Sequence, residues 1–140
     1  MREGAHCTIW VAMRNTRLTI GVSLASLPFI APHVLEDFSL GIAGRVGLPT
    51  PIGACLLGGW LAAQSLGLVW LATGRRAGWL VTGVIGTVWA VVAAVDHGPE
   101  ILAGGFRAGA TSVLWVVGLI VTQATSAALA WTGWRQAPRA

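Results

Sequence analysis

Charge is scarce in this chain. Of its 140 residues, only 10% are Asp, Glu, Lys or Arg, whereas 55% are hydrophobic, and the mean hydropathy is +0.73. A soluble domain carries charge on about a quarter of its residues, so this composition excludes an ordinary water-exposed surface. The chain is therefore predicted to be solvated by lipid.

Four stretches contain no Asp, Glu, Arg or Lys at all. Each reaches the ~18–20 residues that an α-helix needs to cross the hydrocarbon core, and a helix satisfies its own backbone hydrogen bonds where water is absent. We therefore predict an all-α integral membrane protein, a four-transmembrane-helix bundle. Its single domain is expected to span residues 18–140, with helices at about 18–35, 52–73, 78–95 and 110–131.

The first 17 residues match none of these patterns and are expected to form a cytoplasmic tail. Met13, followed by Arg14, would make a natural translation start. The tail is therefore expected to be either unstructured or an extension upstream of the true start, which is Met1 or Met13.

Lysine is absent, so all nine basic residues are arginine, and their positions predict the topology. Seven lie in the two tails and the turn between the second and third helices, and two lie in the other loops. The positive-inside rule then places both termini in the cytoplasm of a multi-pass cell membrane protein (plasma or inner membrane). The arginines flank spans and form no basic stripe, which argues against nucleic-acid binding. The inner set is Arg2, Arg14, Arg17, Arg75, Arg76, Arg135 and Arg139, and the outer set is Arg45 and Arg107.

Several catalytic motifs are also missing. The two cysteines, Cys7 and Cys55, are expected too far apart to form a disulfide, and no Cys-x-x-Cys occurs, which argues against a thiol oxidoreductase. No serine or cysteine nucleophile pattern and no glycine-rich phosphate loop after a strand is found. Whether the chain is an enzyme stays open, with the balance against it.

The two halves of the chain share an order of features. Each half runs from an arginine through a helix to His-x-x-Glu, then to an arginine and a helix with a mid-span glutamine. This order favours a tandem duplication of a two-helix hairpin, with a pseudo-twofold axis along the membrane normal. Coincidence in a chain rich in small residues is the alternative. The matched positions are His33 with His97, Glu36 with Glu100, Arg45 with Arg107, and Gln64 with Gln123.

Small residues recur at every fourth position in the helices, as at Gly59 to Gly67 and at Gly78 to Gly86. Such stripes let helix backbones approach closely in lipid and predict a tight bundle or a homodimer. Gln64 and Gln123 lie in mid-span, where an amide needs partners. We expect them to join helices, or alternatively to line a polar path.

Two short clusters hold most of the side chains that can bind a cation or a proton. Residues 32–37 and 96–100 hold four of the five carboxylates and two of the three histidines. Pro28 and Pro32 are expected to bend the first helix, and Gly98-Pro99 to end the third. If the clusters converge at the outer rim, they form a site for a cation or a proton; otherwise they mark where helices leave the bilayer. The candidate metal ligands are His33, Glu36, Asp37, Asp96, His97 and Glu100.

Four functions are consistent with these patterns. The leading hypothesis is an accessory subunit that docks on another membrane protein, with lipid, a homodimer or a membrane-protein partner as its contacts. The second is an outward-facing site that binds a divalent cation such as zinc, iron or manganese, or that supports proton-linked transport. The third is a b-type haem held by His33 and His97, with Arg45 and Arg107 on its propionates. The fourth is a lipid-modifying enzyme that uses a His/Glu acid–base pair.

Overall fold

The computed structural model describes residues 3–104 and 109–138, and this part of the chain is helical without any strand. The all-α prediction is thus confirmed for the described residues. The elements are α1 (Glu3–Ala25), α2 (Leu27–Ser39), α3 (Ile42–Arg45), α4 (Thr50–Ala72), α5 (Arg76–Leu102) and α6 (Ala110–Gln136).

Four helical segments are long and apolar enough to cross a membrane: Met13–Ser39, Thr50–Ala72, Arg76–Leu102 and Ala110–Gln136. They cover the four predicted helices apart from residue 73 and extend beyond most of the predicted ends, and α1 already begins at Glu3. The first predicted helix ends directly before Glu36 and the third directly before Asp96, and both helical segments continue past these charged residues. Charged side chains at a helix end can stay helical because they reach water at the membrane surface, so charge marks the end of the apolar stretch and not the end of the helix.

Proline acts differently in the two histidine-bearing helices. The helix of the first half breaks at Ser26, and Pro28 lies in the first turn of α2, where a missing N–H costs little. The expected end of the third helix at Gly98-Pro99 is wrong, because α5 continues through Pro99 to Leu102. A proline this close to the helix end removes only one backbone hydrogen bond, which the remaining turn tolerates.

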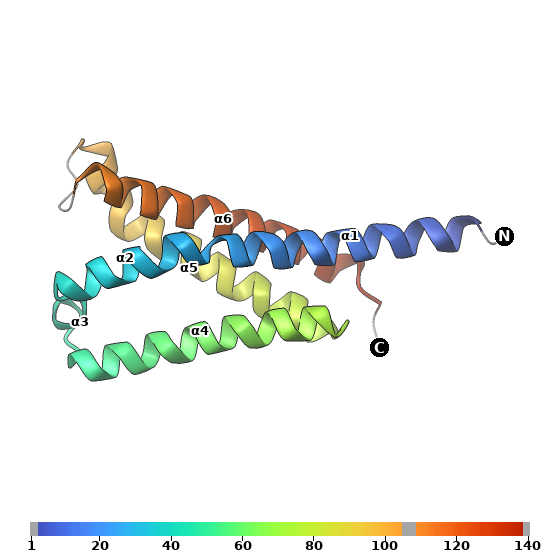
Figure 1. The fold of residues 1–140 in the computed structure, drawn as a ribbon, viewed down its shortest axis with the longest axis horizontal. Helices are drawn as coiled ribbons and strands as arrows, with labels where there is room; N and C mark the ends of the chain where they lie inside the picture. Colours follow the sequence, from blue (N-terminus) through green and yellow to red (C-terminus); the bar gives the residue numbers. More distant parts are fainter. Residues whose placement is uncertain (1–2, 105–108, 139–140) are drawn as a thin grey trace.

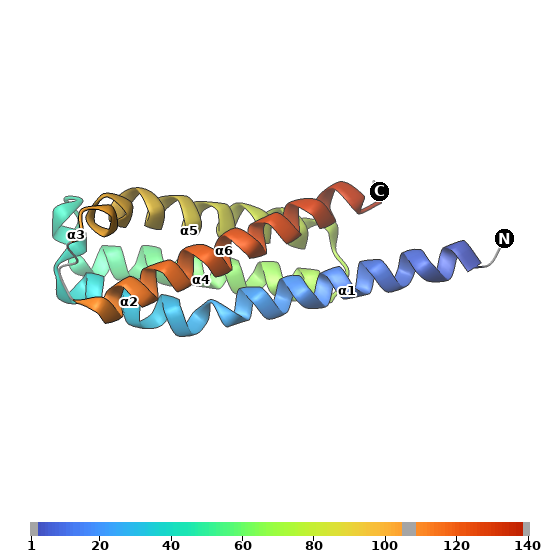
Figure 2. The same ribbon diagram turned by 90° about the horizontal axis from the view of Figure 1, so that it is seen from above.

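The helices form a bundle in which α5 and α6 pack together along much of their length (Figure 1). α1 and α2 pack on α6, whereas α4 packs mainly on α5, with a smaller contact to α1. α4 diverges from α2 towards the end of the bundle that holds α3. In Figure 2, α6 runs obliquely across the bundle, and the N-terminal part of α1 projects beyond the other helices.

Some of the predicted small-residue stripes lie at close helix contacts. A Cβ atom at Gly78 would lie 2.4 Å from the backbone nitrogen of Leu71, and one at Gly86 would lie 2.9 Å from the carbonyl oxygen of Gln123. Gly59, in contrast, has nothing within 4 Å of its Cβ position. The α5 stripe therefore permits close approach to both α4 and α6, while Gly59 makes no such contact.

Both mid-span glutamines join helices, as predicted. Gln64 of α4 is buried and accepts a hydrogen bond of 3.1 Å from the indole N–H of Trp89 in α5. Gln123 of α6 is also buried and donates a hydrogen bond of 2.9 Å to the hydroxyl of Ser26, at the break between α1 and α2. Each amide thus bridges its helix to the histidine-bearing helix of the other half.

Candidate functional site

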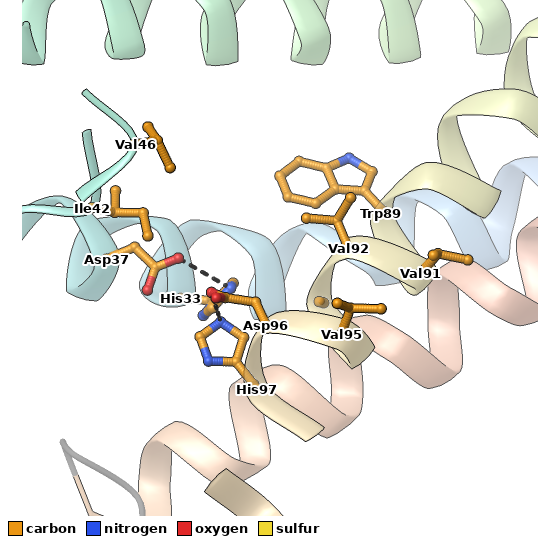
Figure 3. Close-up of a pocket in the computed structure, with 11 residues that line it drawn as sticks. His33, Asp37, Ile42, Val46, Trp89, Val91, Val92, Val95, Asp96 and His97 are labelled. Carbon is orange, nitrogen blue, oxygen red and sulfur yellow. Dashed lines mark ion pairs between the residues drawn. The ribbon is translucent and has the colours of Figure 1, made fainter. Parts of the chain in front are cut away.

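The two predicted clusters converge on a pair of histidines. His33 of α2 and His97 of α5 lie edge to face, with their ring centroids 4.8 Å apart and their planes at 79°. Their exposed fractions are 5% and 9%. Two imidazoles from helices far apart in the sequence thus meet inside the bundle, at the end that holds α3 (Figure 3).

Each histidine has an aspartate beside it. The Oδ2 atom of Asp37 lies 3.4 Å from Nε2 of His33, and Oδ2 of Asp96 lies 3.3 Å from Nε2 of His97. Asp37 follows His33 by four residues, so the two side chains lie one helical turn apart on one face of α2. Asp37 is largely covered, with 19% of its side chain exposed, whereas 47% of the Asp96 side chain is exposed.

Three of these side chains have the spacing of metal ligands. One ligand atom each from His33, Asp37 and His97 can be chosen so that all three lie within 4.8 Å of one another. Ligands of a tetrahedral zinc ion, bound at about 2 Å, lie about 3.3 Å apart. The His33–Asp37 separation of 3.4 Å matches this value, and a ligand atom of His97 lies within 4.8 Å of both groups.

The structure distinguishes among the six predicted ligands. It brings together His33, Asp37 and His97, with Asp96 against His97. Glu36 is half-buried on α2 and Glu100 is half-buried on α5; neither belongs to the group of three. In α2 the carboxylate paired with His33 is that of Asp37, the residue directly after the glutamate of the His-x-x-Glu pattern.

The two arginines that the sequence placed near the site contribute less to it than the histidines and aspartates. Arg45 is exposed in the last turn of α3, and Arg107 lies outside the described residues. Among the described residues, the carboxylates of Asp37 and Asp96 each lie within 3.4 Å of an imidazole nitrogen, so the site offers oxygen ligands beside nitrogen ligands.

The arrangement of the histidines does not fit the haem hypothesis. A porphyrin held by two axial histidines lies between their rings, with each nitrogen on the iron. The rings of His33 and His97 are in contact with each other, at a centroid distance of 4.8 Å. No space for a porphyrin lies between them, whereas a single ion needs none.

A cavity of about 580 Å³ lies beside the histidine cluster. His33, Asp37, Asp96 and His97 line its polar end, and the rest of its wall is apolar (Figure 3). No sequence pattern predicts this cavity, because it depends on the position of α3 relative to α5. The apolar lining comprises Ile42, Val46, Trp89, Val91, Val92, Ala93 and Val95.

Comparisons with known proteins found no match to a family model, a curated protein or a solved structure.

Proposed function

We propose that this chain is a small four-helix membrane protein that binds a divalent transition-metal ion through His33, Asp37 and His97. The observation that supports this proposal is the meeting of the three ligand atoms, from α2 and α5, within 4.8 Å. A cation bound among these side chains would be coordinated by all three groups at once.

The ligand set indicates which metals fit. Two imidazoles and one carboxylate suit zinc, iron(II) or manganese, whereas calcium and magnesium prefer oxygen ligands alone. Asp96, whose Oδ2 lies 3.3 Å from Nε2 of His97 but outside the group of three, is proposed as the fourth ligand of a tetrahedral ion.

The proposal includes a topology. The arginine distribution places both termini and the turn between α4 and α5 in the cytoplasm. The metal site then lies at the outer end of the bundle, where it exchanges ions with the external aqueous phase. Docking on a partner membrane protein, the leading hypothesis from the sequence, is compatible with such a site and stays a prediction.

We also propose that the two halves arose by duplication, which the polar contacts support. Gln64 reaches Trp89, and Gln123 reaches Ser26. Trp89 precedes His97 by about two helical turns, and Ser26 precedes His33 by about the same distance. Each glutamine therefore contacts the opposite histidine-bearing helix at an equivalent height, as a pseudo-twofold axis requires.

The decisive experiment is metal titration of the detergent-purified protein. We expect about one equivalent of Zn²⁺ per chain, with affinity reduced at least tenfold by His33→Ala, His97→Ala or Asp37→Asn. The matched control is Glu36→Gln, which removes the same charge from the neighbouring residue and should leave the affinity within about twofold of wild type.

The opposite results would contradict the proposal. If the wild-type chain binds no transition metal, or if Glu36→Gln and Asp37→Asn weaken binding equally, then no specific site exists. A visible spectrum of the same sample tests haem directly, because a Soret band lost in both histidine variants would select the haem hypothesis instead.

A further inference from the structure

The end of the bundle opposite the histidine cluster holds a second cavity, of about 460 Å³. It lies where α1, the start of α5 and the end of α6 come together, beside the turn at Gly74. The carboxylates at positions 36, 37, 96 and 100 all belong to the other end. The arginines near this cavity are Arg14, Arg17, Arg75, Arg76 and Arg135.

Arg76 is the charged residue that lines this cavity. Its guanidinium carbon lies 4.0 Å from the centre of the Trp134 ring, and its Nε atom is buried without a hydrogen-bond partner. A cation–π interaction with an indole holds a guanidinium group in place and does not use its N–H groups. No ion pair between Arg76 and a carboxylate is found among the described residues.

The remaining polar lining consists of hydrogen-bonding side chains without negative charge. Asn15 and Thr16 come from α1, and Gln136 comes from the end of α6. The amide of Asn15 donates a hydrogen bond of 3.4 Å to Oε1 of Gln136, which ties the two walls together.

Part of the cavity wall is set by close packing between α5 and α6. The ring of Trp79 lies so close to Gly133 that a Cβ atom there would be 2.3 Å from it. Trp79 and Gly133 both line the cavity, so this contact fixes part of its shape.

We propose that this cavity binds a phosphate group, and that its source is the headgroup of an anionic lipid. A planar guanidinium group with amide and hydroxyl donors around it matches phosphate oxygens, and no carboxylate lies among the described residues that line the cavity to compete for the guanidinium group. Basic pockets between membrane helices on the cytoplasmic side recognise such headgroups, and tryptophans such as Trp79 and Trp134 anchor helices at that level. This inference does not depend on the metal site.

The test compares two neighbouring arginines. Native mass spectrometry of the full chain would measure retention of dioleoyl-phosphatidylglycerol against dioleoyl-phosphatidylcholine, for wild type, Arg76→Gln and Arg75→Gln. Both variants lose one positive charge, but Arg75 is exposed and does not line the cavity. We expect Arg76→Gln to weaken phosphatidylglycerol binding about fivefold and Arg75→Gln to change it by less than about twofold.

Two additional arms complete the experiment. Titration with inorganic phosphate distinguishes a lipid headgroup from a soluble anion as the ligand. Phosphate binding that depends on Arg76 supports the phosphate site and identifies a soluble anion as its ligand. If Arg76→Gln does not fold, Arg76→Lys and Arg75→Lys replace the pair, because both keep the charge and only the first changes the geometry in the cavity. Equal effects of substitution at both positions would overturn the inference. It would also be overturned if the protein showed no preference for an anionic headgroup and bound no phosphate.

Discussion

The closest approach of a glycine to the backbone of another helix in the described chain gives a quantitative test of the fold. A Cβ atom added at Gly78 of α5 would lie 2.4 Å from the backbone nitrogen of Leu71 and 2.7 Å from the carbonyl carbon of Trp70, both in α4. Non-bonded atoms of this kind need about 3.5 Å. Since backbone atoms cannot rotate away, Gly78→Ala must separate α4 from α5 by about 1 Å.

The expected cost follows from these distances. Overpacking of this kind destabilises by roughly 1–3 kcal/mol, which exceeds the roughly 0.5–1 kcal/mol that alanine gains over glycine inside a helix. Gly59→Ala in α4 is the matched control, because its Cβ position has nothing within 4 Å. The control should be neutral or stabilising, so the two substitutions are predicted to have opposite signs.

Reversible unfolding in mixed detergent micelles, followed by circular dichroism, measures both free energies. The reasoning would be refuted if Gly78→Ala were as stable as wild type, or if Gly59→Ala were destabilised to the same extent. Either result would mean that α4 and α5 do not meet at Gly78.

Three further predictions follow from the polar groups. Gln123→Leu should lower the free energy of unfolding by about 1 kcal/mol, because the Ser26 hydroxyl loses its donor; the same unfolding assay checks this, and Thr125→Val on the exposed face of α6 is the control. Asp96→Asn should weaken Zn²⁺ binding about tenfold and Glu100→Gln much less, as measured by competition with a chelator; a larger effect of Glu100→Gln would exclude Asp96 as the fourth ligand. Zn²⁺ affinity should fall as the pH is lowered, since protons compete with the metal for the imidazole nitrogens; an affinity independent of pH would exclude histidine ligands.

Much of the architecture could be predicted because a membrane limits the choices. Uncharged stretches of sufficient length become helices, and four of them are described in the structure. This inference needed only the length of the uncharged stretches and the cost of exposing polar groups to lipid. The meeting of His33 with His97 stayed open at the sequence level, because a repeated His-x-x-Glu pattern suggests that the helix ends meet but does not require it.

Other features depend on tertiary packing and were beyond the sequence. Glu36 and Asp37 both follow His33 by about one turn, and only the packing of α2 against α5 decides which carboxylate joins the site. The path of α5 through Pro99 depends on the balance between one lost hydrogen bond and the packing of its last turn. The cavity beside the histidines arises from the position of Ile42 and Val46 relative to α5, for which no sequence pattern exists.

The central claim is that α2 and α5 hold one metal ion together. X-ray absorption spectroscopy at the zinc edge, on the protein loaded with one equivalent of Zn²⁺, counts the imidazole ligands and measures their distances. We predict two imidazoles per zinc, with Zn–N distances of about 2.0–2.1 Å, and the loss of one of them in His97→Ala. A spectrum with one imidazole or none, or one that His97→Ala leaves unchanged, would contradict the account.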